Sequence, residues 1–378
     1  MARLGDICDV RDGTHDSPSY VAEGYPLVTS KNIVDGNLDM SDISYISLED
    51  YNKINERSKV STGDIIMPMI GTIGNPYIVG TFTDFAIKNV ALIKFTNDIV
   101  YNRYIFHFLN SEKFEKYIAE NNRGGTQKFL SLKDIRNIQL NLPPLAEQMD
   151  IVEKLDKVSD LISMRNKQFE KLDELVKSRF IELFGDQKAN PFGWPQSNIG
   201  DCCTLKSGTS LPADKENEGG TIPYVKVGDM NYPGNEQYIT TSSRFVTEQT
   251  AGAGIFPVGT VIFPKRGGAI GTNKKRLTTL PICADLNVMG VTAGTTLKPQ
   301  YLMAYFNMVD LGALDNGSSV PQINNKDIAP LVICLPPLEL QEQFATFVEQ
   351  VDKSKFEIQK SLNQLETLKK VLMQKYFG

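Results

Sequence analysis

The chain has 378 residues, of which 41% are hydrophobic and 22% are charged. This length exceeds that of one ordinary domain and the composition is that of folded protein, so we expect two or three globular domains. The net charge of −5 excludes a strong overall basic surplus, so any DNA binding has to rest on local clusters of cations.

Cysteine and histidine usage limits the kinds of site that the chain can hold. The five cysteines, an odd number with no CxxC spacing, argue against a disulfide scaffold or a zinc site and indicate reduced thiols. Only two histidines, His15 and His107, occur, so few residues could form a histidine-based metal site or catalytic triad. No stretch is apolar enough to span a membrane and MARLGDICDV lacks a signal-peptide core, so we expect a cytoplasmic protein without a membrane partner.

Residues 1–141 are predicted to form a first globule. The segment is rich in Gly and Pro and contains short β-type runs, among them GDIIM (63–67) and VALIKF (90–95). Such runs between turn residues are typical of a mixed α/β domain with curved sheets and long loops. The GTIG turn at 71–74 needs no ligand to explain it.

Residues 142–185 are predicted to form one long helix. The start, LPPLAEQ, places two prolines where the first turn leaves its N–H groups unpaired. Apolar residues then recur at alternating steps of four and three for more than four heptads, which indicates a coiled-coil seam. The seam positions are Ile151, Leu155, Val158, Ile162, Arg165, Phe169, Leu172, Val176, Arg179 and Leu183.

Residues 186–334 repeat the globule, and residues 335–378 repeat the helix. Leu335 follows Leu142 by 193 residues, and the two 44-residue segments that begin there align without a gap, with 12 identical pairs. Upstream, IGDC matches LGDI, GAIG matches GTIG and NKDI matches LKDI. The second seam consists of Phe344, Val348, Val351, Lys355, Ile358, Leu362, Leu365, Lys369, Leu372 and Tyr376.

We expect the two helices to pair with each other. Each would be about 60 Å long at 1.5 Å per residue, too long for one globule to cover. Because the second globule lies between them in the chain, the pair should run antiparallel. The predicted fold is mixed α/β (α+β), with two repeated domains, two long antiparallel coiled-coil helices and a pseudo-twofold axis.

Signatures of catalysis are missing from the sequence. There is no phosphate-binding GxxxxGK[ST] loop, and NPFG at Asn190 only half matches the motif that holds a flipped adenine in amino-methyltransferases. The acidic residues of the helices stand at solvent-facing spacing. We therefore expect neither a catalytic residue nor a metal site.

Cations without nearby acids mark the candidate DNA-binding residues. PKRGGAIGTNKKR (264–276) has five bases and no acid, and NNRGGTQKF (121–129) is also acid-free. Glycines allow close approach to a phosphate backbone, which Lys and Arg neutralise, and Arg, Asn and Gln read base edges. The alternative is an ordinary exposed basic loop. On charge and residue type alone, the candidates are Lys31, Asn32, Lys88, Arg123, Gln127, Lys128, Lys226, Lys265, Arg266, Lys274, Lys275, Arg276 and Gln322.

With these features, the whole chain resembles the specificity subunit of type I restriction–modification systems. The resemblance rests on LKDIRNIQLNLPPLAEQ, on NKDIAPLVICLPPLELQEQF, and on LGDI and IGDC at the globule starts. It implies that 1–141 and 186–334 are target-recognition domains and that 142–185 and 335–378 are the spacer helices. Recognition domains vary widely within the family, so individual DNA contacts do not carry over.

The resemblance also implies the partners and cofactors. The chain would bind a bipartite site on double-stranded DNA and direct two methyltransferase subunits and the restriction (translocase) subunits. It would hold no cofactor itself, while its partners would use S-adenosylmethionine, ATP and Mg²⁺. Two readings compete with this one: a non-enzymatic coiled-coil scaffold that binds protein ligands, and a fused enzyme with an unrecognised catalytic globule.

Overall fold

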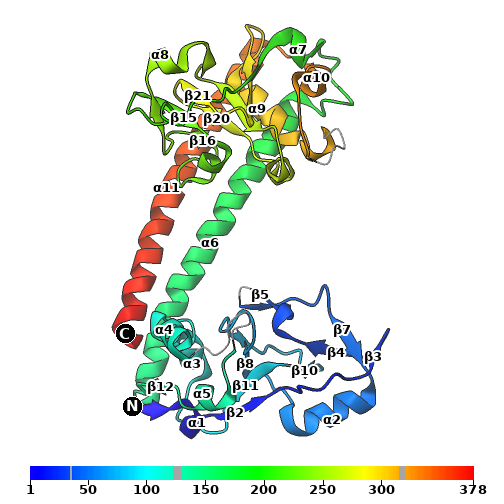
Figure 1. Ribbon diagram of the computed structural model, residues 1–378. Coiled ribbons are helices and arrows are strands. Elements are labelled where there is room, and N and C mark those ends of the chain that lie inside the picture. Colours follow the sequence, from blue (N-terminus) through cyan, green and yellow to red (C-terminus); the bar gives the residue numbers. More distant parts are fainter. Residues whose placement is uncertain (35, 122–128, 315–319) are drawn as a thin grey trace. The chain divides into compact units, whose positions relative to one another are not determined.

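The structure, a computed structural model, describes residues 1–34, 36–121, 129–314 and 320–378. They form two compact units, one of Met1–Asn166 with Gln359–Gly378 (unit 1) and one of Lys167–Ile358 (unit 2). Each unit holds one globule together with parts of the two long helices, α6 (Leu145–Phe184) and α11 (Leu338–Phe377), which can be followed in Figure 1. The domain boundaries expected at the helix ends remain a prediction.

The first globule is built from four small sheets, one of them the pair β5-β6, and five short α-helices among the described residues. A four-stranded sheet has the order β2-β11-β8-β9, a second has the order β10-β4-β7-β3, and β1 pairs with β12. The elements are β1 (Ala2–Arg3), α1 (Leu4–Ile7), β2 (Asp9–Asp12), β3 (Tyr20–Val21), β4 (Tyr25–Val28), η1 (Ser30–Asn32), β5 (Ile33–Val34), β6 (Asn37–Leu38), β7 (Ser44–Ile46), α2 (Leu48–Ser58), β8 (Ile65–Pro68), β9 (Tyr77–Ile78), β10 (Ala86–Ile87), β11 (Val90–Lys94), α3 (Asn102–Phe108), α4 (Glu112–Asn121), α5 (Leu132–Arg136) and β12 (Gln139–Leu140).

The second globule follows the same plan. Its larger sheet has the order β14-β22-β19-β20-β16, its second sheet the order β17-β15-β21-β18, and β13 pairs with β23. The elements are β13 (Gln196–Asn198), α7 (Ile199–Cys202), β14 (Cys203–Ser207), β15 (Ile222–Val225), η2 (Val227–Asn231), β16 (Tyr238–Ile239), β17 (Phe245–Val246), α8 (Glu248–Ala251), η3 (Gly252–Gly254), β18 (Ile255–Phe256), β19 (Thr260–Pro264), η4 (Gly268–Thr272), β20 (Arg276–Thr278), β21 (Ile282–Ala284), β22 (Val288–Ala293), α9 (Pro299–Met308), η5 (Gly312–Leu314), α10 (Asn325–Ile328) and β23 (Val332–Cys334).

The repeated motifs of the sequence occupy equivalent places in the two globules. In DGT and SGT, a Cβ on Gly13 would lie 2.3 Å from the carbonyl oxygen of Ile87, and one on Gly208 would lie 2.0 Å from that of Asp285. Only glycine therefore allows this close approach of two backbone segments. In KDI, the carboxylates of Asp134 and Asp327 accept from the backbone N–H three residues earlier and cap the short helix that contains them.

The repeated glutamine of LPPLxxQ ties each long helix to its globule. The Gln148 amide donates to the carbonyl oxygens of Ile99 and Pro143, and its oxygen accepts from the N–H of Tyr101. The Gln341 amide makes the same three bonds, to Thr296, Pro336 and the N–H of Lys298. Both glutamines have no exposed surface, so each satisfies buried backbone groups where the helix begins.

The seam predicted for the two helices is confirmed, and the pair runs antiparallel within each unit. In unit 1, Leu155 near the start of α6 shares a core with Phe377 at the end of α11. In unit 2, Phe180 near the end of α6 shares a core with Phe344 near the start of α11. Each predicted seam position is buried or half-buried. Phe180 lies outside the predicted seam because the helix there also packs on the globule, where its ring stacks on Tyr301 at 5.1 Å.

The polar seam residue Lys355 is satisfied inside unit 2. Its side chain is 8% exposed, and its ammonium pairs with the carboxylate of Asp173 on α6. It also donates to Oε1 of Gln237 at 3.3 Å and lies 5.5 Å from the ring centre of Phe169. One cation thus joins both long helices to the second globule, which favours a single register of the helix pair.

Candidate DNA-binding surface

Arg266 and Gln322, distant in sequence, lie opposite each other in the second globule. They form an isolated antiparallel bridge just beyond the end of β19. The Arg266 side chain is exposed, and Gln322 is half-buried with its amide donating to Oδ1 of Asn324 at 2.9 Å. The neighbouring Lys265 donates to the hydroxyl of Ser207 at 2.9 Å. Burial and the positive charge of Arg266 lower the pKa of Lys265.

Lys275 and Arg276, two of the predicted DNA-binding residues, are buried or half-buried and form hydrogen bonds within the fold. Lys275 is 4% exposed and donates to Oδ1 of Asn273 at 2.7 Å and to the carbonyl of Val309 at 2.6 Å. Burial lowers its pKa to about 8. Arg276 donates to the carbonyl oxygens of Asn235, Lys275 and Met230. Both cations donate to backbone carbonyl oxygens. The charge pattern of the sequence alone could not predict these partners.

The remaining candidate cations of the second globule, Lys274 and Lys226, differ in the partners of their ammonium groups. Lys274 is half-buried and donates to the side-chain oxygen of Asn231. Lys226 forms an ion pair with Glu216 at 2.7 Å, so its charge is already partly neutralised. Among the described residues, Lys226 is thus bonded to a carboxylate and Lys274 to a neutral amide oxygen.

In the first globule the predicted residues are scattered. Lys31 is exposed, whereas Asn32 is 5% exposed and its side chain caps η1 by accepting from the N–H of Thr29 at 3.0 Å. Lys88 donates to the hydroxyl of Ser17 at 3.2 Å. The structural role of Asn32 explains its presence without DNA. The candidates Arg123, Gln127 and Lys128 lie outside the described residues.

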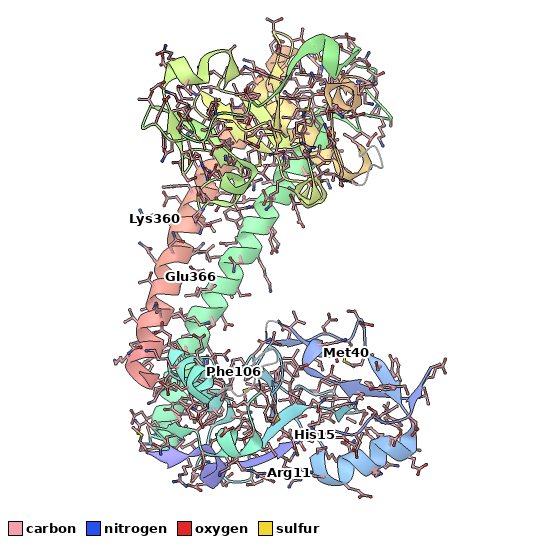
Figure 2. All side chains as sticks on the ribbon, in the orientation of Figure 1. Arg11, His15, Met40, Phe106, Lys360 and Glu366 are labelled. Atoms are coloured by element: carbon pink, nitrogen blue, oxygen red, sulfur yellow. The ribbon has the colours of Figure 1, made fainter. Side chains whose placement is uncertain are left out.

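A cluster of polar side chains around His15 was not predicted from the sequence. The His15 ring lies 2.9 Å from Oδ2 of Asp12 through Nε2 and 2.8 Å from Oδ1 of Asn89 through Nδ1. The hydrogen bond with Asp12 is the main cause of a raised pKa for His15. The guanidinium of Arg57 also pairs with Asp12, beside a cavity of about 390 Å³. Figure 2 shows His15 and Arg11 beside α2. The DGT motif just before His15 was the available signal.

Residues 1–34, 36–121, 129–314 and 320–378 contain neither a metal-binding cluster nor a membrane-spanning helix. Within these ranges no group of three or more His, Cys, Asp or Glu side chains could hold a metal ion. No described helix is long and apolar enough to cross a membrane.

Comparison with known proteins decides the family. The family model for the type I restriction–modification DNA specificity domain matches residues 1–174 and again residues 191–367. The chain belongs to this family. It is a specificity subunit of a type I restriction–modification system, and its function is recognition of the DNA target rather than catalysis. The coiled-coil scaffold that binds only protein ligands is not supported.

Known relatives match the specificity subunit over nearly its whole length. The putative type I restriction enzyme MjaX specificity subunit of Methanocaldococcus jannaschii is 23% identical over 408 residues, covering 99% of this chain and 91% of the relative. The EcoKI specificity subunit of Escherichia coli is 22% identical over 379 residues, covering 91% and 79%.

Solved structures agree on the fold. The S subunit of the type I system from M. genitalium superimposes with a TM-score of 0.59 at 14% identity, covering 100% of this chain and 95% of that one. A chain from a structure on complex assembly and conformational transition of the type I R-M system gives 0.60 at 20% identity, covering 99% and 96%. The predicted fold, with two repeated mixed α/β domains and two long helices, is confirmed.

Proposed function

We propose that each globule reads one half of a bipartite DNA target, with residues 1–141 and 186–334 as the two target-recognition domains. One observation carries this proposal: the two globules share a frame but present different side chains at equivalent places. The bridge formed by Arg266 and Gln322 in the second globule corresponds to a bridge between Ile70 and Phe129 in the first. A common frame with different contacts suits a protein that reads two different half-sites.

Residues 142–185 and 335–378 are the spacer helices in this proposal, and they receive the partner subunits. Their outward faces carry exposed apolar side chains, which occur singly on most surfaces but here recur along both helices. They include Leu161, Met164, Leu175 and Ile181 on α6, with Phe356, Leu368 and Val371 on α11. Two methyltransferase subunits, one for each half, and the restriction (translocase) subunits complete the complex in the cytoplasm. S-adenosylmethionine, ATP and Mg²⁺ belong to these partners.

The residues proposed to contact DNA are those whose side chains reach solvent. They include Lys31 and Lys88 in the first globule, and Lys265, Arg266, Lys274 and Gln322 in the second. Lys226 contributes once its pair with Glu216 opens. Lys275, Arg276 and Asn32 support these surfaces through the hydrogen bonds described above.

The proposal is tested with the purified full chain, with and without methyltransferase subunits. DNA binding should weaken steeply as salt rises, since phosphate contacts release counterions. Transfer of a labelled methyl group to DNA should require the added subunits. Methyl transfer by the chain alone would contradict the proposal, as would binding that salt does not change.

A further inference from the structure

The bridge between Arg266 and Gln322 places two side chains on one face. The N–H of Ile323 donates to the carbonyl of Lys265 at 2.9 Å, and the N–H of Gly267 donates to that of Pro321 at 2.8 Å. These bonds flank the pair without joining Arg266 and Gln322 directly. Arg266 and Gln322 are therefore a non-hydrogen-bonded pair of antiparallel strands. In such a pair the Cα atoms are about 4.5 Å apart and both side chains lie on the same side.

The face that carries Arg266 and Gln322 points away from the core. Ile323, between Gln322 and Asn324, is fully buried in the core of the globule, so its two neighbours point outward. Among the residues that the structure describes, no acidic side chain forms an ion pair with Arg266 or Lys265. Arg266 is therefore a cation without a carboxylate on this face and attracts an anion, whereas Lys265, opposite the buried Ile323, lies on the other face.

Glycines keep the approach to this face open. Gly268 and Gly271 follow Arg266 in η4, and a Cβ on either would meet nothing within 4 Å. Neither has a positive φ, in contrast to Gly267 with a φ of +74°. The fold therefore does not require glycine at 268 or 271. The close approach of a bound molecule such as DNA explains why residues 268 and 271 have no side chain.

The first globule uses the same backbone device with other side chains. Its bridge joins Ile70 and Phe129, and the N–H of Leu130 donates to the carbonyl of Met69 at 3.0 Å, as Ile323 does to Lys265. Ile70 and Phe129 pack against the hydrophobic core of unit 1. A polar pair at this place is thus a property of the second globule and not of the shared frame.

We infer that Arg266 and Gln322 read two neighbouring base pairs of the half-site recognised by the second globule, Arg266 a guanine and Gln322 an adenine. Arginine donates two hydrogen bonds to O6 and N7 of guanine, and glutamine pairs two-handedly with N6 and N7 of adenine in the major groove. Their narrow spacing matches adjacent base pairs, about 3.4 Å apart. The inference rests on the proposed function, in which the second globule reads one half-site.

The experiment selects bound sequences from randomised DNA with the full chain and its methyltransferase subunits. Arg266→Ala should relax the preference for one guanine, and Gln322→Ala that for one adjacent adenine, each by roughly 5- to 150-fold. Arg266→Lys keeps the charge but loses the two-pronged donor, so it should retain the salt dependence and still relax the guanine. Lys215→Ala and Gln249→Ala, at exposed positions of the second globule away from the candidate residues, are the matched controls.

The glycines give a second readout that does not depend on base identity. Gly268→Ala and Gly271→Ala should leave the midpoint of thermal unfolding unchanged or higher, because they restrict the unfolded chain without strain. The same variants should bind the selected site at least tenfold more weakly, because the new methyl group meets the DNA. Normal affinity of both variants would show that DNA does not approach η4 and would overturn the inference.

Different results would contradict the proposed function and the assignment of Arg266 and Gln322. If the wild-type complex selects no sequence, the proposed function is wrong. If it selects a bipartite site and Arg266→Ala and Gln322→Ala leave both half-sites unchanged, only the assignment of these two residues is wrong. Relaxation in the half-site read by the first globule would also overturn the assignment.

Discussion

Nε2 of His107 on α3 lies 2.8 Å from Oδ1 of Asp156 on α6, and this contact joins the first globule to the long helix within unit 1. Arg103 donates to the other carboxylate oxygen at 2.7 Å. Burial lowers the pKa of His107, although the carboxylate works against that shift. Burial raises the pKa of Asp156, but the bonds from Arg103 and His107 outweigh it and leave that pKa lowered.

These pKa shifts predict that acid weakens unit 1. Because the pKa of His107 is lower in the folded chain, the unfolded state binds more protons as the pH falls below about 6.5. Stability contributed by neutral His107 is therefore lost on acidification. In His107→Gln, the drop in the free energy of unfolding between pH 7 and pH 5 should be smaller than in the wild type, as measured by chemical denaturation.

His15 provides the control of opposite sign. Its pKa is raised, so its contribution is present below about 6.5 and is lost as the pH rises through the folded value. His15→Gln should therefore make the drop between pH 7 and pH 5 larger. If both variants shift the profile in the same direction, the assignment of these two environments is wrong.

Gln148→Ala and Gln341→Ala should destabilise the chain to a similar degree. Each removes three hydrogen bonds at a fully buried position and leaves backbone groups at the helix start without a partner. A cost of about 1–3 kcal/mol or more is expected for each. Gln343→Ala, at an exposed position on the same helix as Gln341, should change stability by less than about 0.5 kcal/mol. Equal effects of all three variants in denaturant titrations would contradict the role of Gln148 and Gln341 in tying each long helix to its globule.

The seam predicts unequal costs along the two helices. Leu155 is fully buried, so Leu155→Ala should cost about 2–5 kcal/mol. Leu365 is only half-buried, so Leu365→Ala should cost less. Neither change should alter the preferred bases, because both side chains lie in the seam of the long helices and are apolar. Denaturant titration and sequence selection check the two statements, and a changed base preference would be the contrary result.

Lys274 and Lys275 are neighbours in sequence with different expected roles. Lys274→Ala should lower the slope of log affinity against log salt by about 0.9 for the lost phosphate contact, with little change in stability. Lys275→Ala should instead cost about 1–3 kcal/mol of stability, because it removes the hydrogen bonds to the carbonyl of Val309 and Oδ1 of Asn273. The reverse pattern in salt titrations and unfolding curves would show that Lys275 is the contact.

The sequence predicted features that depend on repetition and period. The gapless repeat from Leu142 and Leu335 places both long helices, and the steps of four and three find the seam because burial follows helix geometry. The strands Ile65–Pro68 and Val90–Lys94 follow from apolar runs bounded by turns. These signals are local, so no tertiary contact is needed to read them.

The candidate site was less accessible to such reasoning. The burial of Lys275 depends on Val309, and the pairing of Arg266 with Gln322 depends on the register of a long-range bridge. Nothing in the immediate sequence distinguishes Lys275 from Lys274. Similarly, the role of His107 becomes visible only when α6 brings Asp156 beside it. Charge and residue type therefore indicated a candidate region, which stays a prediction, while the hydrogen-bond partners of its side chains required the fold.

The central claim, that two globules read two separate half-sites, is tested most directly by exchanging one of them. Residues 186–333 are replaced by the corresponding segment of a relative, and the target is selected from randomised DNA in the presence of methyltransferase subunits. The account predicts a bipartite target in which one half changes and the other half stays as in the wild type. A change in both halves, or in neither, would contradict it.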